Sequence, residues 1–401
     1  MPTRDYTYYD LTVSICSTCK RRVFAKIIFQ ESKVYMLKHC MTHGKEKILI
    51  STDIDYYKKC REYIKPSEMP VKFNTETVYE CPYDCGLCPD HEQHSCVSIV
   101  EVTDRCNLSC PTCYAESSPK HGRHRSLAEI NKMFDAVIKN EKHADVLQIS
   151  DGEPTIHPDF FEILALAKTK PIRHLMLNTN GIKIAKNKEF VKRLAEFYPG
   201  FEVYLQFDSF QASALERLRG IDLTTIRQKA IDNLNEYNLS TTLVVTLQKG
   251  VNDHEIGEII QYALKQDCVR GVTFQPTQVA GRTKNFKLNE NRYTLSEARS
   301  AIIKQSKLFQ EADLLPVPCN PDALVMGYAL KYEGDVYPLT RHFDPGKLLE
   351  EIDNTIVVET NLLIKEKLLN IFSSAHPVEN ATDELNALMC CLPKISAPTL
   401  S

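Results

Sequence analysis

The most constraining feature of this sequence is a loop at residues 104–114 that contains Cys106, Cys110 and Cys113. Three residues separate the first two thiols and two separate the next pair, so one short loop can place all three around a corner of an iron–sulfur cube. Three thiolates bind three irons of a [4Fe–4S] cluster, whereas ordinary electron-carrying clusters use four cysteines. The spacing therefore predicts a cluster with one open iron. The alternative, a structural zinc loop, would need a fourth ligand close by.

A second motif follows about forty residues later. Residues 146–150 are expected to form a buried strand, and Asp-Gly-Glu-Pro-Thr follows it at 151–155. Alone this is an ordinary turn. Together with the triad it resembles the radical S-adenosylmethionine (SAM) superfamily, with Asp151 in place of a glycine. The resemblance implies that the open iron binds SAM, and that the SAM contacts include Tyr114, Gly152, Glu153 and Pro154.

Residues 97–280 alternate apolar strands with amphipathic helices. Strands are expected near 98–103, 145–150, 173–178, 202–207, 241–247 and 271–276. Helices are expected near 126–140, 159–168, 188–197, 223–237 and 254–265. This alternation predicts an α/β fold with a parallel sheet. The resemblance implies an open, partial (β/α)6 barrel, a TIM-like barrel whose chemistry lies at the carboxyl ends of its strands.

Polar residues follow several of the expected strands. Asn180 follows the third, Asp208 the fourth and Gln275 the sixth, with Arg282 just beyond. By resemblance, Asn180 lies where the SAM ribose is bound. Arg282 is a candidate partner for the SAM carboxylate, because a guanidinium matches a carboxylate with two hydrogen bonds. A loop hydrogen bond or helix cap is the alternative role for each residue.

Residues 1–75 are expected to form a small ribbon-like, rubredoxin-like metal module. A strand at 22–29 and its hairpin partner at 33–38 separate two ligand-bearing turns. The expected ligands of one zinc or iron ion are Cys16, Cys19, Cys40 and His43, with Cys60 as the alternative fourth. The metal is expected to be structural, because so small a module has little core of its own.

Residues 76–97 repeat the spacing of the triad. Cys81, Cys85 and Cys88 are followed by Cys96, with seven residues between Cys88 and Cys96. We expect these four to hold an auxiliary [4Fe–4S] cluster, and a zinc site is the alternative.

The last part, residues 283–401, has a weaker pattern. Cys319 lies in a proline-rich loop, and residues 334–340 are expected to form an edge strand. Cys319, Cys390 and Cys391 could hold a second auxiliary cluster, or the last two could pack as small apolar groups. Cys319 is also a candidate hydrogen-atom donor. Cys268 is expected in the core.

Composition limits the function classes. The chain has 401 residues, a formal net charge of −3 and no long basic run, so nucleic acid is not an expected partner. No signal peptide opens it, and no apolar run reaches the roughly 18 residues of a spanning helix. Of its 15 cysteines, 11 lie in the first 113 residues, which indicates metal ligands and a reducing compartment. We therefore expect a cytoplasmic protein, for which a lipid substrate could still require peripheral membrane contact.

The full cysteine arrangement over residues 14–340 resembles the archaeal tetraether lipid synthases and methanopterin-methylase-like radical SAM proteins. The resemblance implies reductive SAM cleavage to a 5′-deoxyadenosyl radical, hydrogen abstraction from carbon, and C–C bond formation or alkylation of a lipid or a pterin-like small molecule. A flavodoxin- or ferredoxin-type protein would supply the electron. Peptide modification is the alternative reaction. An iron–sulfur or electron-transfer protein without SAM chemistry is the alternative of another class.

Overall fold

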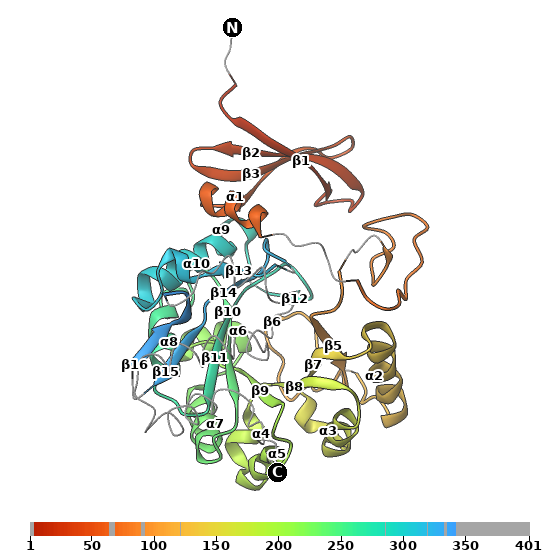
Figure 1. The fold of residues 1–401 in the computed structure, drawn as a ribbon, viewed down its shortest axis with the longest axis vertical. Helices are drawn as coiled ribbons and strands as arrows, with labels where there is room; N and C mark the ends of the chain where they lie inside the picture. Colours follow the sequence, from red (N-terminus) through yellow and green to blue (C-terminus); the bar gives the residue numbers. More distant parts are fainter. Residues whose placement is uncertain are drawn as a thin grey trace, which may run out of the picture.

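The protein consists of a small antiparallel sheet, an α/β domain and a set of short hairpins (Figure 1). The computed structural model describes residues 4–63, 69–89, 93–120, 122–284, 286–318, 320–332 and 335–341. Cys319, Cys390 and Cys391 lie outside the described residues, so their predicted roles stay predictions. No helix in the described part of the chain is long and apolar enough to cross a membrane.

The N-terminal module is a four-stranded antiparallel sheet in the order β1-β2-β3-β4. Its strands are β1 (Thr7–Ile15), β2 (Arg22–Gln30), β3 (Lys33–Cys40) and β4 (Gly44–Ser51). The predicted hairpin is β2–β3. The outer strands β1 and β4 were not predicted, and they place the two ligand-bearing turns at the same end of the sheet.

The module continues into α1 (Ile54–Glu62), whose first turn is capped by the Asp53 carboxylate. It contacts the α/β domain through α10 (Leu295–Ser306). The Thr52 N–H donates to the Ser296 hydroxyl at 2.8 Å, and Arg292 donates to the Leu49 carbonyl oxygen at 2.7 Å. Figure 1 shows the resulting arrangement, with the antiparallel sheet stacked at one end of the larger domain.

Six parallel strands form the main sheet, in the order β11-β10-β9-β8-β7-β5. They are β5 (Val97–Glu101), β7 (Ala144–Ser150), β8 (Ile172–Thr179), β9 (Phe201–Gln206), β10 (Thr241–Leu247) and β11 (Val269–Pro276). Every strand predicted for the barrel is present, and the partial-barrel prediction is confirmed. The sequential order follows from short crossovers that each return the chain to the neighbouring strand.

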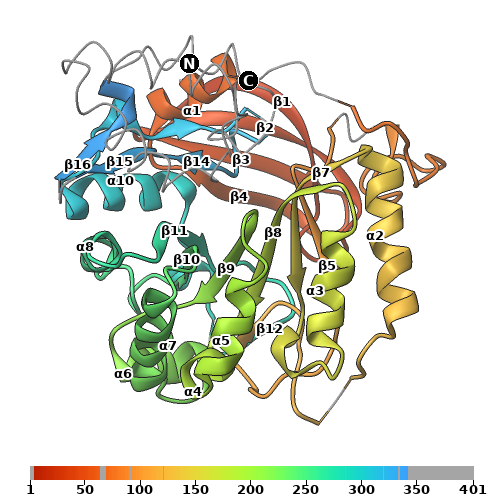
Figure 2. The ribbon, with the colours of Figure 1, turned by 60° about the horizontal axis from the view of Figure 1, so that its bottom comes forward.

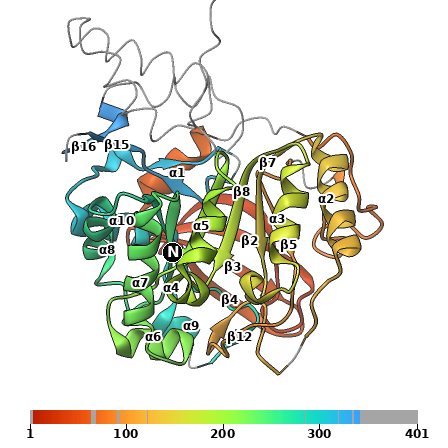
Figure 3. The same ribbon diagram turned by 90° about the horizontal axis from the view of Figure 1, so that it is seen from below.

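Helices cover the outer face of this sheet (Figures 2 and 3). They are α2 (Leu127–Glu141), α3 (Phe160–Lys168), α4 (Ile182–Lys186), α5 (Lys188–Ala195), α6 (Ala212–Arg219), α7 (Thr224–Glu236) and α8 (Ile256–Leu264). The short α9 (Leu288–Asn291) precedes α10 in the chain. The five predicted helices correspond to α2, α3, α5, α7 and α8. The five-residue α4 is too short to show a helical period, and α6 was not predicted either.

The main core lies between the sheet and these helices. Every residue of β7 is buried, because Leu147 and Ile149 pack in the core and the alternate residues face the inside of the barrel. Phe134, Ile163 and Leu234 supply core side chains from three of the helices. Cys268 is fully buried in the same cluster, so its predicted core position is confirmed.

Short strands complete the fold beside the open side of the barrel. β12 (Arg282–Thr283) pairs with β6 (Thr112–Cys113), which connects the chain beyond the barrel to the cysteine loop. Two further pairs are β13 (Leu315–Pro316) with β14 (Val325–Met326), and β15 (Ala329–Tyr332) with β16 (Asp335–Pro338). The predicted edge strand at 334–340 corresponds to β16. Single helical turns lie at Pro154–Ile156, Glu311–Asp313 and Leu339–Arg341.

Candidate functional site

A cavity of about 1330 Å³ occupies the inside of the partial barrel. The cysteine loop and the carboxyl ends of the strands form one end of it, and segments beyond the barrel close its open side. All three triad cysteines line the cavity, as do Tyr114, Gly152 and Asn180. The tertiary structure therefore gathers most of the predicted SAM-binding residues around one space.

The triad loop holds its thiols at the cavity wall. Cys106 and Cys110 are 9% and 8% exposed, and Cys113 is half-buried. Burial raises the pKa of the Cys106 thiol to about 12 and also raises the pKa of Cys110. Thiolates at these positions need a cationic partner, because burying an uncompensated charge is costly. An iron–sulfur cluster fits this donor set.

The spacing of the thiols also fits a cluster better than a single ion. Among the described residues, the one group of His, Cys, Asp or Glu ligand atoms within 4.8 Å of one another is in the N-terminal module. The triad thiols do not form such a group. Ligands of one zinc ion must be close together, whereas the thiolates of a cluster bind different irons.

Arg282 supports the triad loop from outside. Its Nε donates to the Cys110 carbonyl oxygen at 2.6 Å, and its two terminal nitrogens donate to the carbonyl oxygens of Glu116 (3.2 Å) and Ser117 (2.8 Å). The predicted role of Arg282 as a partner of the SAM carboxylate is not supported by this geometry. Its guanidinium instead fixes the backbone of the loop on both sides of Cys113.

The turn after β7 passes very close to the triad loop. Gly152 has φ +53°, and a Cβ there would lie 2.1 Å from the Arg105 carbonyl oxygen. Asp151, at the position where the superfamily has glycine, adopts φ +72°. Aspartate tolerates this left-handed conformation better than most side chains, so the substitution preserves the turn. The turn therefore presents bare backbone to the cavity, which suits close approach of a ligand.

Glu153 has a structural task. Its carboxylate accepts hydrogen bonds from the hydroxyls of Thr155 and Thr179, both at 2.6 Å, and from the Asn180 N–H at 2.7 Å. It is 1% exposed, and burial raises its pKa. Glu153 thus ties the turn after β7 to the end of β8, and its carboxylate is fully engaged within the protein. Pro154, also buried, begins the single helical turn that follows.

A chain of polar side chains crosses the carboxyl ends of the strands. Tyr114 Oη lies 3.2 Å from Ser150 Oγ, which accepts from Asn178 Nδ2 at 3.0 Å. Asn178 Oδ1 accepts from Gln206 at 3.0 Å, and Gln206 accepts from Arg219 at 2.7 Å. All five line the cavity. The chain orients the hydrogen-bonding groups that a polar ligand would meet beside the triad.

Asp208 lies beneath this chain and is fully buried. Arg219 donates to both of its carboxylate oxygens, at 2.8 and 2.6 Å, and Arg227 lies 3.4 Å away. Burial alone would raise the pKa of Asp208, but the two cations outweigh it and hold that pKa below its ordinary value. The predicted site residue is therefore a buried anchor, and the side chain that lines the cavity beside Cys110 is Arg219.

The two remaining predicted residues of the barrel are Asn180 and Gln275, and each donates a side-chain hydrogen bond. Asn180 donates to Asn107 Oδ1 at 2.6 Å and lines the cavity. Gln275 donates to the Tyr204 hydroxyl at 2.8 Å and also lines the cavity. Arg219, Arg227 and Gln206 were not predicted from the sequence. Gln206 could have been found by continuing the inward-facing alternation of β9, whereas the two arginines come from helices and carry no motif.

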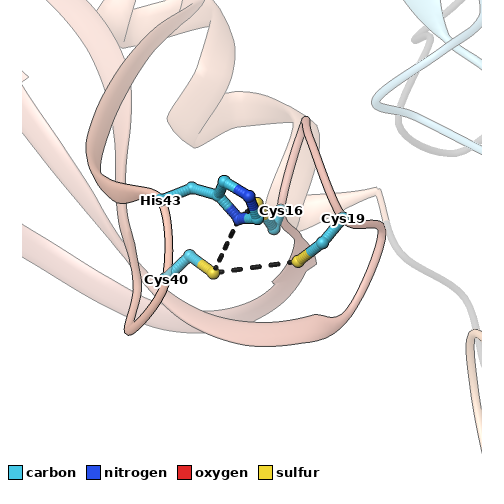
Figure 4. A group of neighbouring side chains, drawn as sticks. All are labelled: Cys16, Cys19, Cys40 and His43. Carbon is cyan, nitrogen blue, oxygen red and sulfur yellow. Dashed lines mark hydrogen bonds between the residues drawn. The ribbon is translucent and has the colours of Figure 1, made fainter.

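The N-terminal module brings its four predicted ligands together (Figure 4). The ligand atoms of Cys16, Cys19, Cys40 and His43 all lie within 4.8 Å of one another. Backbone N–H groups of Thr42 and His43 lower the pKa of Cys40 to about 7. Three thiols and one imidazole that converge in this way match the tetrahedral ligand set of a zinc or iron ion.

Cys60, the alternative fourth ligand, lies elsewhere. Its thiol is buried on α1 beside Tyr56, Arg61 and Arg299, and burial raises its pKa. It is not part of the four-residue group, so the alternative is wrong.

The second cysteine-rich segment is less closely assembled. Cys81 and Cys85 are exposed, Cys88 is buried, and Cys96 lines the barrel cavity beside β5. Within the described residues these four do not form a group with ligand atoms inside 4.8 Å of one another. The segment is nevertheless ordered by Asp84, which accepts from the N–H groups of Val78 and Glu80.

Comparison with known families gives two matches. Residues 100–263 match the radical SAM superfamily, and residues 8–52 match the HMPTM N-terminal zinc ribbon domain. The first range contains the triad, the turn after β7, the end of β5 and the whole of β7, β8, β9 and β10. The second contains the four ligands of the N-terminal module.

Two curated relatives are informative. The chain is 37% identical over 313 residues to the 7,8-dihydro-6-hydroxymethylpterin dimethyltransferase of Methanocaldococcus jannaschii, a match that covers 77% of this chain and 61% of that protein. It is 28% identical over 191 residues to the GTP 3′,8-cyclase of Listeria monocytogenes, covering 45% and 55%. The chain thus spans less than two thirds of the length of either relative.

A solved structure with a similar arrangement is Streptococcus suis SuiB bound to S-adenosylmethionine. The superposition has a TM-score of 0.42 and 20% sequence identity, and it covers 52% of this chain and 46% of that one.

Proposed function

The chain contains a radical SAM domain, and we propose that it is a radical SAM enzyme that alkylates or methylates a carbon atom of a pterin-like small molecule. The observation that carries this proposal is the convergence of Cys106, Cys110 and Cys113 with the glycine turn at 152 on one cavity. A dimethyltransferase acting on a hydroxymethylpterin is the relative with 37% identity. That relative favours a pterin-like substrate over a lipid.

The assignment of residues follows from the site. Cys106, Cys110 and Cys113 would bind a [4Fe–4S] cluster, and the backbone of the turn at 151–154 would receive the methionine part of SAM. Held by these residues, a [4Fe–4S] cluster and SAM would supply radical chemistry that abstracts hydrogen from carbon after one-electron reduction. The chain's own residues exclude water from the barrel and fix the loop and the ligand-facing polar groups. The reductant would be a flavodoxin- or ferredoxin-type protein.

The other cysteines belong to the same proposal. The four residues of the N-terminal module would hold one structural zinc or iron ion. Cys81, Cys85, Cys88 and Cys96 would hold an auxiliary cluster, with support from their spacing and from the position of Cys96 on the cavity wall. Residues 1–75 would then be the ribbon, 76–97 the auxiliary segment, 98–282 the barrel and 283–401 an extension. Free clustered thiols and oxygen-sensitive cofactors suit the reducing cytoplasm.

Anaerobic reconstitution tests the proposal. After iron and sulfide are counted, dithionite is added and 5′-deoxyadenosine is measured for the wild type and the Cys106→Ala/Cys110→Ala/Cys113→Ala variant. We expect SAM cleavage by the wild type alone and a loss of about four irons per chain in the variant. Cys268→Ala, which removes a buried core thiol, is the control for folding.

A fully loaded wild type that does not cleave SAM, with or without a hydroxymethylpterin, would contradict the proposal. An electron-transfer role would then be the better explanation of the cysteines.

A further inference from the structure

The floor of the barrel cavity carries an acid–imidazole pair that the proposed SAM chemistry does not use. His174 Nε2 and Glu202 Oε2 are 2.8 Å apart, and both side chains line the cavity. They come from neighbouring strands, β8 and β9. Their side chains are 25% and 14% exposed, so the pair is largely withdrawn from solvent. A surface ion pair would be far more exposed.

The pair lies at the opposite end of the strands from the cysteine triad. His174 precedes Asn178 by four residues and Glu202 precedes Gln206 by four, and Asn178 and Gln206 belong to the polar chain beside the triad. At a rise of about 3.3 Å per residue, the floor and this chain are separated by roughly 13 Å along the strands. Met176 and Tyr204 line the cavity between the two levels.

The walls between these levels suit a flat ring. Tyr204 and Met176 offer an aromatic and a polarisable surface. Burial raises the pKa of Tyr204 to about 12, so its hydroxyl stays protonated, and it accepts from Gln275. A bicyclic heterocycle is shorter than the distance between the levels. One edge of it can therefore contact the floor while the other faces the triad.

Glu202 remains able to accept further hydrogen bonds. His174 contacts one of its oxygens, and among the described residues the other oxygen has no hydrogen-bond partner. A carboxylate offers about four lone-pair sites on its two oxygens. It pairs best with two parallel N–H groups, as in a guanidine-like edge.

We propose that Glu202, oriented by His174, is the specificity-determining residue of the barrel and binds the two N–H groups of a cyclic, guanidine-like edge, as in a 2-amino-4-oxopteridine. This inference rests on the proposed function and names the substrate class of the same cavity. The ring is then oriented with its far side toward the cysteine triad. His174 is a positioning residue, since it acts by fixing the carboxylate.

The chemistry predicts a switch in ligand preference. Replacing the 2-amino group of a pterin by a 2-oxo group turns a donor into an acceptor. Glu202→Gln makes the matching change in the protein, because an amide supplies one donor and one acceptor. The wild type should thus prefer the 2-amino ligand, and the variant should prefer the 2-oxo ligand.

Anaerobic equilibrium dialysis measures this directly on the reconstituted full chain with SAM present. The probes are 6-hydroxymethylpterin and 6-hydroxymethyllumazine, its 2-oxo counterpart. We expect the wild type to bind the pterin at least tenfold more tightly. Glu202→Gln should weaken pterin binding by roughly 10- to 100-fold, the range for a charge-assisted hydrogen bond, and bind the lumazine more tightly than the wild type does. Glu196→Gln, which removes the same charge at an exposed site, should change neither affinity.

His174 is tested by two variants. His174→Leu should weaken pterin binding, and His174→Gln should restore much of it, because an amide can still donate to Glu202. A merely structural histidine would show no such rescue.

The inference is overturned if the wild type binds the two pteridines equally, or neither, or if Glu202→Gln keeps the wild-type preference. The comparison of the two pteridines on the wild type does not depend on whether any variant folds. SAM cleavage is measured separately, so a chain that cleaves SAM but does not distinguish the pteridines contradicts this inference alone. A chain that distinguishes them without cleaving SAM contradicts the proposed function alone.

Discussion

Arg282 donates a hydrogen bond from Nε to the carbonyl oxygen of Cys110, at 2.6 Å, across 172 residues of sequence. The contact joins the first segment beyond the barrel to the centre of the triad loop. The pairing of β12 with β6 lies directly beside it. The loop that would bind the cluster is therefore fixed by a part of the chain that is distant in sequence.

Arg282→Ala should reduce cluster retention. Three carbonyl oxygens would lose a charged donor, which we expect to cost at least about 2 kcal/mol of stability. Iron release to a chelator and urea unfolding of the apoprotein measure the two effects. Arg282→Lys should be intermediate, since an ammonium cannot reproduce the planar guanidinium.

The control is Arg217→Ala, which removes an exposed arginine of α6. If Arg282→Ala keeps its iron but loses SAM affinity, the residue binds SAM directly, and our interpretation of it as a loop support is wrong.

Gly152→Ala should disrupt SAM binding. The new Cβ would lie 2.1 Å from the Arg105 carbonyl oxygen, so one of the two backbones must move. Gly250→Ala is a matched control, because Gly250 also has a positive φ (+73°) but has no atom within 4 Å of its ideal Cβ. Both variants should lose about 1 kcal/mol from the left-handed conformation. We expect only Gly152→Ala to lose roughly tenfold or more in SAM affinity, measured by anaerobic dialysis.

Equal SAM affinities for the two alanine variants would mean that the turn and the triad loop need not be in contact for SAM to bind.

Asp208→Asn should be strongly destabilising. It would leave the guanidinium groups of Arg219 and Arg227 buried without their shared carboxylate, which typically costs about 3–5 kcal/mol. Glu236→Gln, which breaks an exposed ion pair with Lys188, should cost less than about 1 kcal/mol. Denaturant unfolding of the apoproteins compares the two. Similar losses in the two variants would contradict a special role for the buried cluster.

The effect of Asp208 should depend on pH in a defined direction. Its folded-state pKa lies below its ordinary value, so the ionised group stabilises the fold above its unfolded pKa of about 3.9. That stabilisation is lost as the pH falls through the folded-state pKa. The difference in unfolding free energy between wild type and Asp208→Asn should therefore be constant above about pH 5 and shrink below about pH 4. A difference that grows on acidification would contradict the assignment.

The N-terminal module should bind one metal ion per chain. His43→Ala should lose it, whereas Cys60→Ser should keep it, because Cys60 lies outside the four-ligand group. Metal analysis of the dialysed proteins tests both. Because the pKa of Cys40 is about 7, protons should compete with the metal below that pH, and affinity should fall as the solution is acidified.

A metal that dissociates from Cys60→Ser as readily as from His43→Ala would contradict this ligand set. Removal of the ion from the wild type should unfold the module while the circular dichroism of the barrel helices persists.

Much of the fold was predictable from sequence because its signals are local. Strand and helix periodicity identified β5 and β7–β11 and the longer helices, since each buries one face against the core. The turn chemistry of Cys16-x-x-Cys19 and Cys40-x-x-His43 predicted four residues that the structure brings together. The triad and the turn at 151–154 are short motifs, and each can be recognised from residues that are adjacent in the sequence.

The sequence by itself determined which segments carry the cysteines, the strands and the glycine turn, because these depend on spacing of a few residues. Only the tertiary structure decided what their neighbours are. It assigned Arg282 to the back of the triad loop, Arg219 and Arg227 to Asp208, and Glu202 to His174. Such pairs depend on how helices and strands pack after the sheet has formed, and no local pattern specifies the partner of a long side chain. The expected ligands of the site come from short sequence motifs, whereas the side chains that fix those motifs come from distant parts of the chain.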